Sequence, residues 1–212
     1  MVLASHVIFG TYGFWLPNDP RGSGSDFVGS WELFRYGKAT KVTTRASVAA
    51  APNNRQLRAA AKQVLKYPPV IFTGLQARTV ARGFAESAAR GNVTVYACAI
   101  LPEHVHIVIA RHEVMVEKIV ALFKANATRQ LILEKLHPFM AYRTKCGRVP
   151  TCWGENCWKV FLNSEEDVGR AIKYVQDNPI KDGKRLQTWS FVKPIPVSFC
   201  PGSRSRANSE SL

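Results

Sequence analysis

The stretch that decides the fold is YACAILPEHVHIVIA, residues 96–110. Its two apolar runs are typical of short strands, and the Leu-Pro-Glu between them is typical of a tight turn. Side chains alternate between the two faces of a strand, so His104 and His106 project from one face and Val105 from the other. Two imidazoles on one face can bind a divalent metal together, although a complete site needs a further ligand.

This histidine pair has two interpretations. Two neutral imidazoles suit Mn, Co, Ni or Zn, and Mg²⁺ when oxygen ligands and a phosphate complete the shell. A short His-x-His motif also fits a polar sheet face on which neighbouring groups satisfy both rings. The rest of the chain must therefore favour one of them.

Composition bounds the class of protein. The chain has 212 residues, 46% of them hydrophobic, which suits one globular domain. It has no apolar run of the about 20 residues that a bilayer requires and no secretory signal pattern, so we expect a cytoplasmic protein without a membrane partner. Its 29 Lys and Arg against 15 Asp and Glu give a net charge of +14. That excess favours a polyanionic partner, with nucleic acid first.

The five cysteines are an odd set without any Cys-x-x-Cys pair. Their spacing favours reduced thiols over a structural zinc site.

Periodicity predicts an α+β domain. Strands are expected at 5–12, 96–100 and 104–110 and within 152–162, and helices at 56–66, 76–90, 114–134 and 164–178, the last ending before Pro179. Leaving aside the first helix, this order is that of a ferredoxin-like α/β sandwich with a central antiparallel sheet. We expect one domain over residues 1–193, with 22–55 as an inserted flexible region and 194–212 as a disordered tail.

Several motifs carry a family resemblance. PEHVHIV at 102–108 resembles the histidine-hydrophobic-histidine signature of the HUH endonucleases. It is most similar to the single-tyrosine transposases of bacterial insertion sequences and to the REP-associated tyrosine transposases. YVQDNPIKDG at 174–183 and GFWLPNDPRGS at 13–23 resemble further elements of these proteins. In the stretch at 13–23, Phe14 and Asn18 depart from the family's pattern.

The resemblance implies an HUH endonuclease-like fold and a reaction. Tyr174 would be the nucleophile of a DNA nicking and strand-transfer enzyme, forming a 5′-phosphotyrosine intermediate. His104, His106 and Asn178 would bind the metal, with Mg²⁺ or Mn²⁺ expected. Asn178 lies four residues after Tyr174, which places both on one face of a helix. The implied partner is single-stranded or hairpin DNA, and a homodimer is possible in this family.

Candidate DNA contacts follow from the basic and aromatic residues near these motifs. Trp15 and Arg21 would pair a stacking platform with a phosphate clamp, although Trp15 fits a packing role equally well. Lys173 and Lys181 would supply positive charge beside Tyr174. Lys124 and Arg129 resemble a basic pattern of the family, but a charged helix face is as often simply solvated.

Other functions remain open on the sequence. A ferredoxin-like RNA- or DNA-binding module without catalysis fits the frame, but such modules stack bases on sheet aromatics where this chain has His104 and His106. A domesticated, non-mobile DNA-binding protein also fits. A two-histidine phosphoesterase would need a second His-x-Thr or His-x-Ser motif, which this chain lacks.

Overall fold

A single antiparallel sheet organises the chain in the computed structural model, which describes residues 1–17, 19, 27–39 and 54–195. Its strands are β1 (Ala4–Gly10), β2 (Val95–Ile100), β3 (His104–Ala110) and β4 (Trp158–Leu162), in the order β2-β3-β1-β4. All three neighbouring pairs are antiparallel. The predicted α+β class and ferredoxin-like strand arrangement are confirmed.

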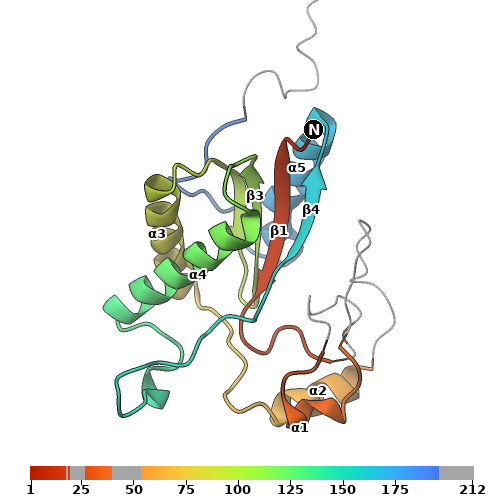
Figure 1. Cartoon of the computed structure of the whole chain (residues 1–212), viewed down its shortest axis with the longest axis vertical. Coiled ribbons are helices and arrows are strands. Elements are labelled where there is room, and N and C mark those ends of the chain that lie inside the picture. The colour runs from red at the N-terminus through yellow and green to blue at the C-terminus, as the bar shows by residue number, and fades with distance from the viewer. Residues whose placement is uncertain (18, 20–26, 40–53, 196–212) are drawn as a thin grey trace, which may run out of the picture.

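Helices cover both faces of this sheet, so the domain has three layers (Figure 1). The helices α3 (Gly74–Arg90) and α4 (Val116–Leu133) pack against each other on one face. The helix α5 (Glu165–Lys181) packs on the opposite face, against β2 and β3. Odd-numbered residues of β3, such as Val105 and Ile107, point to the α3/α4 layer, and even-numbered residues such as Val108 point to α5.

The α3/α4 layer holds the larger core, which is built from aromatic rings. Phe84 of α3 stacks on Phe123 of α4 with ring centroids 5.2 Å apart, and Phe9 contacts both Phe84 and Trp153 edge to face. Such arrangements suit the quadrupoles of the rings. A Cβ on Gly83 would lie 2.5 Å from the Ala127 Cα, so the two helices cross at a point where only glycine fits.

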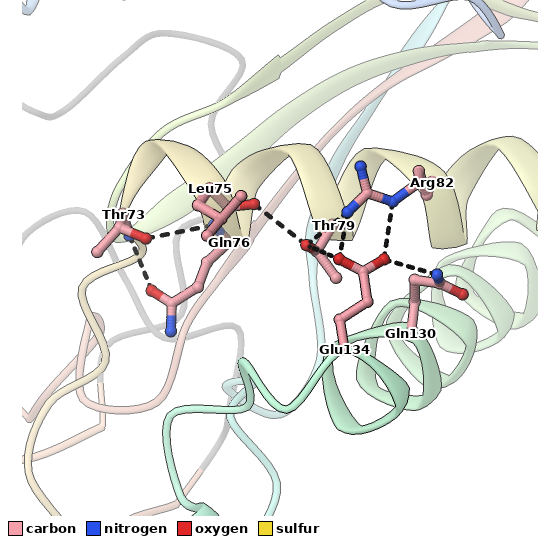
Figure 2. Close-up of polar contacts among 7 residues, drawn as sticks. All are labelled: Thr73, Leu75, Gln76, Thr79, Arg82, Gln130 and Glu134. Carbon is pink, nitrogen blue, oxygen red and sulfur yellow. Dashed lines mark hydrogen bonds and ion pairs between the residues drawn. The ribbon is translucent and has the colours of Figure 1, made fainter.

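Polar contacts fix α3 against the end of α4 (Figure 2). Thr73 and Gln76 form a capping box at the start of α3. Further along, Glu134 accepts hydrogen bonds from Thr79, Arg82 and Gln130. These donors, Arg82 first and Gln130 second, lower the pKa of the Glu134 carboxyl to about 2. The carboxylate therefore stays ionised and ties the two helices together.

The helix α5 begins as predicted but extends further. The Ser164 hydroxyl accepts from the Asp167 N–H, and the acidic residues of the first turn complement the helix dipole. The prediction that Pro179 ends the helix is wrong, because α5 continues to Lys181. A proline in the last turn removes one intrahelical hydrogen bond, and the Pro179 ring is buried where it lies.

The remaining segments surround the ends and the edge of the sheet. The helices α1 (Trp31–Phe34) and α2 (Arg55–Gln63) lie beyond the C-terminal end of β1 (Figure 1). After α5, the Gln187 amide exchanges two hydrogen bonds with the backbone of Ile100, and the Trp189 indole donates to the Cys98 carbonyl. This segment therefore covers the outer edge of β2, which limits the pairing of β2 with other chains.

The predicted insertion and tail can be compared with the structure only in part. Residues 27–39 include the short helix α1, and the other residues of 22–53 lie outside the described ranges. Ile195, which we expected in the tail, is half-buried against the α5 core, whereas 196–212 lie outside the description. Among the described helices, none is long and apolar enough to cross a membrane.

Candidate metal and nucleophile site

The predicted histidine pair lies on the α5 face, at the end of the sheet where β3 begins. His104 and His106 have ring centroids 4.9 Å apart. The ring of Phe14, from the turn after β1, stacks on His104 with centroids 4.6 Å apart and an interplanar angle of 14°. The turn resembling the family element therefore packs directly on the first histidine of the motif, and fixes its orientation.

A third histidine joins this pair. His6 of β1 lies diagonally across from His106, because Ile8 is the residue directly opposite His106 in the register. The His6 Nε2 and His106 Nδ1 atoms are 3.2 Å apart, and the two rings stack with centroids 5.5 Å apart. We did not predict this residue. Alternation along β1 places His6 on one sheet face, but nothing in the sequence specified that this face meets His106.

Burial keeps the two contacting imidazoles neutral. Loss of hydration lowers the pKa of His6 to about 4. The pKa of His106 is lowered well below its ordinary value, first by burial and then by repulsion from His104 and His6. Neutral imidazoles have a lone pair to offer, which is the form that binds a metal.

The predicted nucleophile lies above these rings. Tyr174 of α5 contacts His6 and His106 edge to face, with centroid distances of 5.7 and 5.6 Å. Its side chain is nevertheless 38% exposed. The phenol is therefore both beside the histidines and open to a substrate from solvent. Residues of β1, β3 and α5 meet here, although His6 and Tyr174 are separated by about 170 residues of sequence.

The donor set fits a divalent metal once an oxygen ligand is added. Asn178 lies one turn after Tyr174, and its amide nitrogen donates to the Tyr174 carbonyl at 3.2 Å. The amide oxygen would therefore be the atom that binds a metal. In the described ranges, no three His, Cys, Asp or Glu side chains group as a metal site. His104, His106 and the Asn178 oxygen, with a substrate phosphate, would form a mixed nitrogen and oxygen shell.

Positive charge and an aromatic side chain lie around this centre. The Lys181 ammonium is 5.0 Å from the centroid of the Tyr174 ring, and Lys173 is exposed on the same helix. Trp15 is half-buried and contacts Phe14, the residue stacked on His104. Arg21, the predicted phosphate clamp, lies outside the described residues.

Two other predicted DNA contacts have structural partners. The Lys124 ammonium donates to the carbonyls of Gly154 and Asn156 at 2.8 and 2.7 Å, and burial lowers its pKa to about 8. Arg129 forms an ion pair with Glu86. We therefore assign Lys124 and Arg129 to the packing of α4 and leave them out of the proposed DNA path. The pattern of charges along a helix could not distinguish these roles, because the partners are remote in sequence.

The chain matches no protein-family model and no curated protein. Among solved structures it is similar to a REP-associated tyrosine transposase bound to a REP hairpin, with 13% identity and a TM-score of 0.43, over 85% of this chain and 68% of that one. It is also similar to a candidate transposase from Deinococcus radiodurans R1, with 10% identity and a TM-score of 0.38, over 87% of this chain and 92% of that one. Identities and TM-scores this low do not indicate an activity. The residues of the site are therefore the basis for the function proposed below.

Proposed function

We propose that this chain is a metal-dependent DNA nicking and strand-transfer enzyme of the HUH type, with Tyr174 as its nucleophile. The observation that carries the proposal is the contact of Tyr174 with His106, the second histidine of the pair. The centroids of the Tyr174 and His106 rings are 5.6 Å apart, and the Tyr174 side chain is also open to solvent. A tyrosine that served only to pack α5 would have no need of neutral, metal-competent imidazoles beside it.

The proposed reaction exchanges one phosphoester bond for another. The Tyr174 oxygen attacks a DNA phosphorus, loses its proton, and forms a 5′-phosphotyrosine bond. The bond from phosphorus to the 3′ oxygen breaks, and that oxygen departs with a proton as a 3′-hydroxyl. Because an ester replaces an ester, a second 3′-hydroxyl can reverse the step and rejoin the strands.

Each residue of the site has a role in this proposal. His104, His106 and Asn178 would hold Mg²⁺ or Mn²⁺, which polarises the phosphate and neutralises charge when bound. The Lys181 ammonium over the Tyr174 ring stabilises negative charge on the phenol oxygen during attack. Burial of His106 on the sheet fixes the ring in one position, so that the phosphate and the phenol are held in one geometry.

Single-stranded or hairpin DNA is the proposed substrate. The net charge of +14 favours a polyanion, and Lys173 and Lys181 place part of that charge on α5 beside the phenol. Trp15, on the turn that packs on His104, is the residue that we propose stacks on an unpaired base. A base-paired strand would offer no exposed base for such a contact.

A covalent adduct tests the proposal. The chain would be incubated with end-labelled single-stranded and hairpin oligonucleotides and Mn²⁺, and analysed on a denaturing gel. We expect a band of protein linked to DNA that disappears with EDTA and is absent with fully duplex DNA. Binding without any adduct across a set of hairpins would contradict nicking, and would leave a DNA-binding module on the same fold.

A further inference from the structure

We propose that His6 is a positioning residue, which accepts a hydrogen bond from the His106 Nδ1–H and thereby directs the lone pair of His106 Nε2 to the metal. This inference rests on the proposed function, since it assumes that His106 is a ligand. It assigns a role to a buried group that the reaction described above does not use. It also predicts which tautomer each imidazole adopts.

The contact itself requires a proton between the two rings. His6 Nε2 and His106 Nδ1 are 3.2 Å apart, and both side chains are more than nine-tenths buried. A neutral imidazole has one N–H and one lone pair, so one ring donates and the other accepts. If His106 donates from Nδ1, its Nε2 has a lone pair for a ligand. If His6 donates instead, His106 Nε2 carries the proton and cannot bind a metal.

The surroundings of His6 explain why it can hold His106 in place. It lies on β1, which is hydrogen-bonded on both sides, to β3 and to β4. The ring edge contacts with Trp158 and Tyr174, at centroid distances of 6.0 and 5.7 Å, limit its rotation. A ligand that is held by a second residue on a rigid strand keeps its geometry before the metal arrives.

His6 is better placed for this role than as a third ligand. Its Nε2 is directed at His106, and no grouping of three metal-binding His, Cys, Asp or Glu side chains occurs within the described part of the chain. Metal-binding histidines are commonly oriented in this way through their second nitrogen. Loss of such a partner typically weakens metal binding by about 10 to 100-fold.

The test combines a spectroscopic readout with metal affinity. Long-range ¹H–¹⁵N spectra of the metal-free chain, labelled at histidine, report the tautomer of each ring, and the His106 signals are identified by their loss in His106→Gln. We expect the Nδ1–H form at His106 in the wild type, and a mixture in His6→Leu. Calorimetric titration with Mn²⁺ should show affinity reduced by about 10 to 100-fold in His6→Leu. His6→Gln, whose amide oxygen can accept the bond, should recover most of it.

The outcomes separate this inference from the proposed function. His112→Gln serves as the control, because His112 lies at the other end of β3 and should leave Mn²⁺ affinity unchanged. Mn²⁺ binding that is equal in wild type and a folded His6→Leu would overturn the role of His6 alone. An Nε2–H tautomer at His106 in the wild type would also overturn it, even if His6→Leu does not fold. Absence of Mn²⁺ binding in the wild type would overturn both.

Discussion

Different kinds of side chain line the two faces of the sheet. The α3/α4 face is filled by large rings, with Phe9, Phe84 and Phe123 in contact. The α5 face is lined mainly by small side chains, among them Ala97 and Ala99, and one end of it is occupied by imidazoles instead of hydrocarbon. The larger face stabilises the domain, and the smaller one lets α5 approach the sheet closely enough to place Tyr174 on the histidines.

The difference between the two faces explains how a small domain can hold buried polar groups. Three imidazoles at one end of the α5 face cost apolar contacts that this face would otherwise make. The opposite face supplies the missing stability, since its aromatic residues bury the most apolar area per side chain. Stability and the proposed chemistry are therefore separable here, and each should respond to its own set of mutations.

The largest effect on stability is expected on the α3/α4 face. Phe84→Ala removes a fully buried ring that contacts Phe9, Phe123 and Trp153. It should lower the free energy of unfolding by about 3 to 5 kcal/mol. Urea unfolding of the metal-free chain measures this. A loss below about 1 kcal/mol would mean that this face is not the principal core.

The largest effect on activity is expected on the α5 face. His104→Ala or His106→Ala should reduce Mn²⁺-dependent nicking by at least about 100-fold, equivalent to about 2.7 kcal/mol. DNA binding should change little, because phosphate contacts to basic residues supply most affinity. The measurements are adduct yield and fluorescence anisotropy of a labelled hairpin. His112→Ala is the matched control, and nicking preserved in either site variant would contradict the metal site.

A histidine outside the site sharpens the comparison. His137 is buried next to Phe139, whose N–H its Nδ1 accepts, and burial lowers its pKa to about 4. The unfolded chain takes up this proton near pH 6.5, so stability is complete above that pH and is lost as the pH falls toward 4. His137 contributes at most about 3 kcal/mol to this loss.

The contribution of His137 can be isolated by subtraction. His137→Gln cannot titrate, so its free energy of unfolding should fall less than that of the wild type between pH 6.5 and 4. Its nicking activity at pH 7 should match the wild type once both are folded, because His137 has no role at the site. Parallel stability curves for the two proteins would show that His137 is not neutral in the fold.

The smallest effects come from two helix glycines, one in each helical layer. Gly83 in α3 lies against the Ala127 backbone, whereas a Cβ on Gly169 in α5 would meet nothing within 4 Å. Gly83→Ala should therefore destabilise by about 1 to 3 kcal/mol through overpacking. Gly169→Ala should stabilise by about 0.5 to 1 kcal/mol through helix propensity. Thermal melts of both variants measure this, and equal signs would contradict the difference in packing between the layers.

Sequence patterns predicted most of the fold because hydrophobic residues repeat with a different period in strands and in helices. The strands around His104 and the helices α3 and α4 were predicted close to their observed bounds. The end of α5 was missed because the rule that proline ends a helix is local, whereas the buried Pro179 ring lies within the packed last turn of α5.

The site could be predicted only where its residues lie close together in the sequence. Alternation placed His104 and His106 on one face, and helical spacing placed Tyr174 near Asn178. His6 was missed because its contact with His106 depends on the register between β1 and β3. The partners of Lys124 were missed because Gly154 and Asn156 lie on a loop that is remote from it in the sequence.

The central claim is that Tyr174 is the nucleophile, and one measurement tests it most directly. Wild type, Tyr174→Phe and Tyr142→Phe would be incubated with Mn²⁺ and a labelled hairpin that the wild type nicks, and the adduct would be digested and located by mass spectrometry. Tyr142 is the control because it is 44% exposed, close to the 38% of Tyr174, but lies outside the site. We predict a DNA-linked peptide containing Tyr174 in the wild type and in Tyr142→Phe, and no adduct in a folded, DNA-binding Tyr174→Phe. An adduct of wild-type yield in Tyr174→Phe would contradict the account.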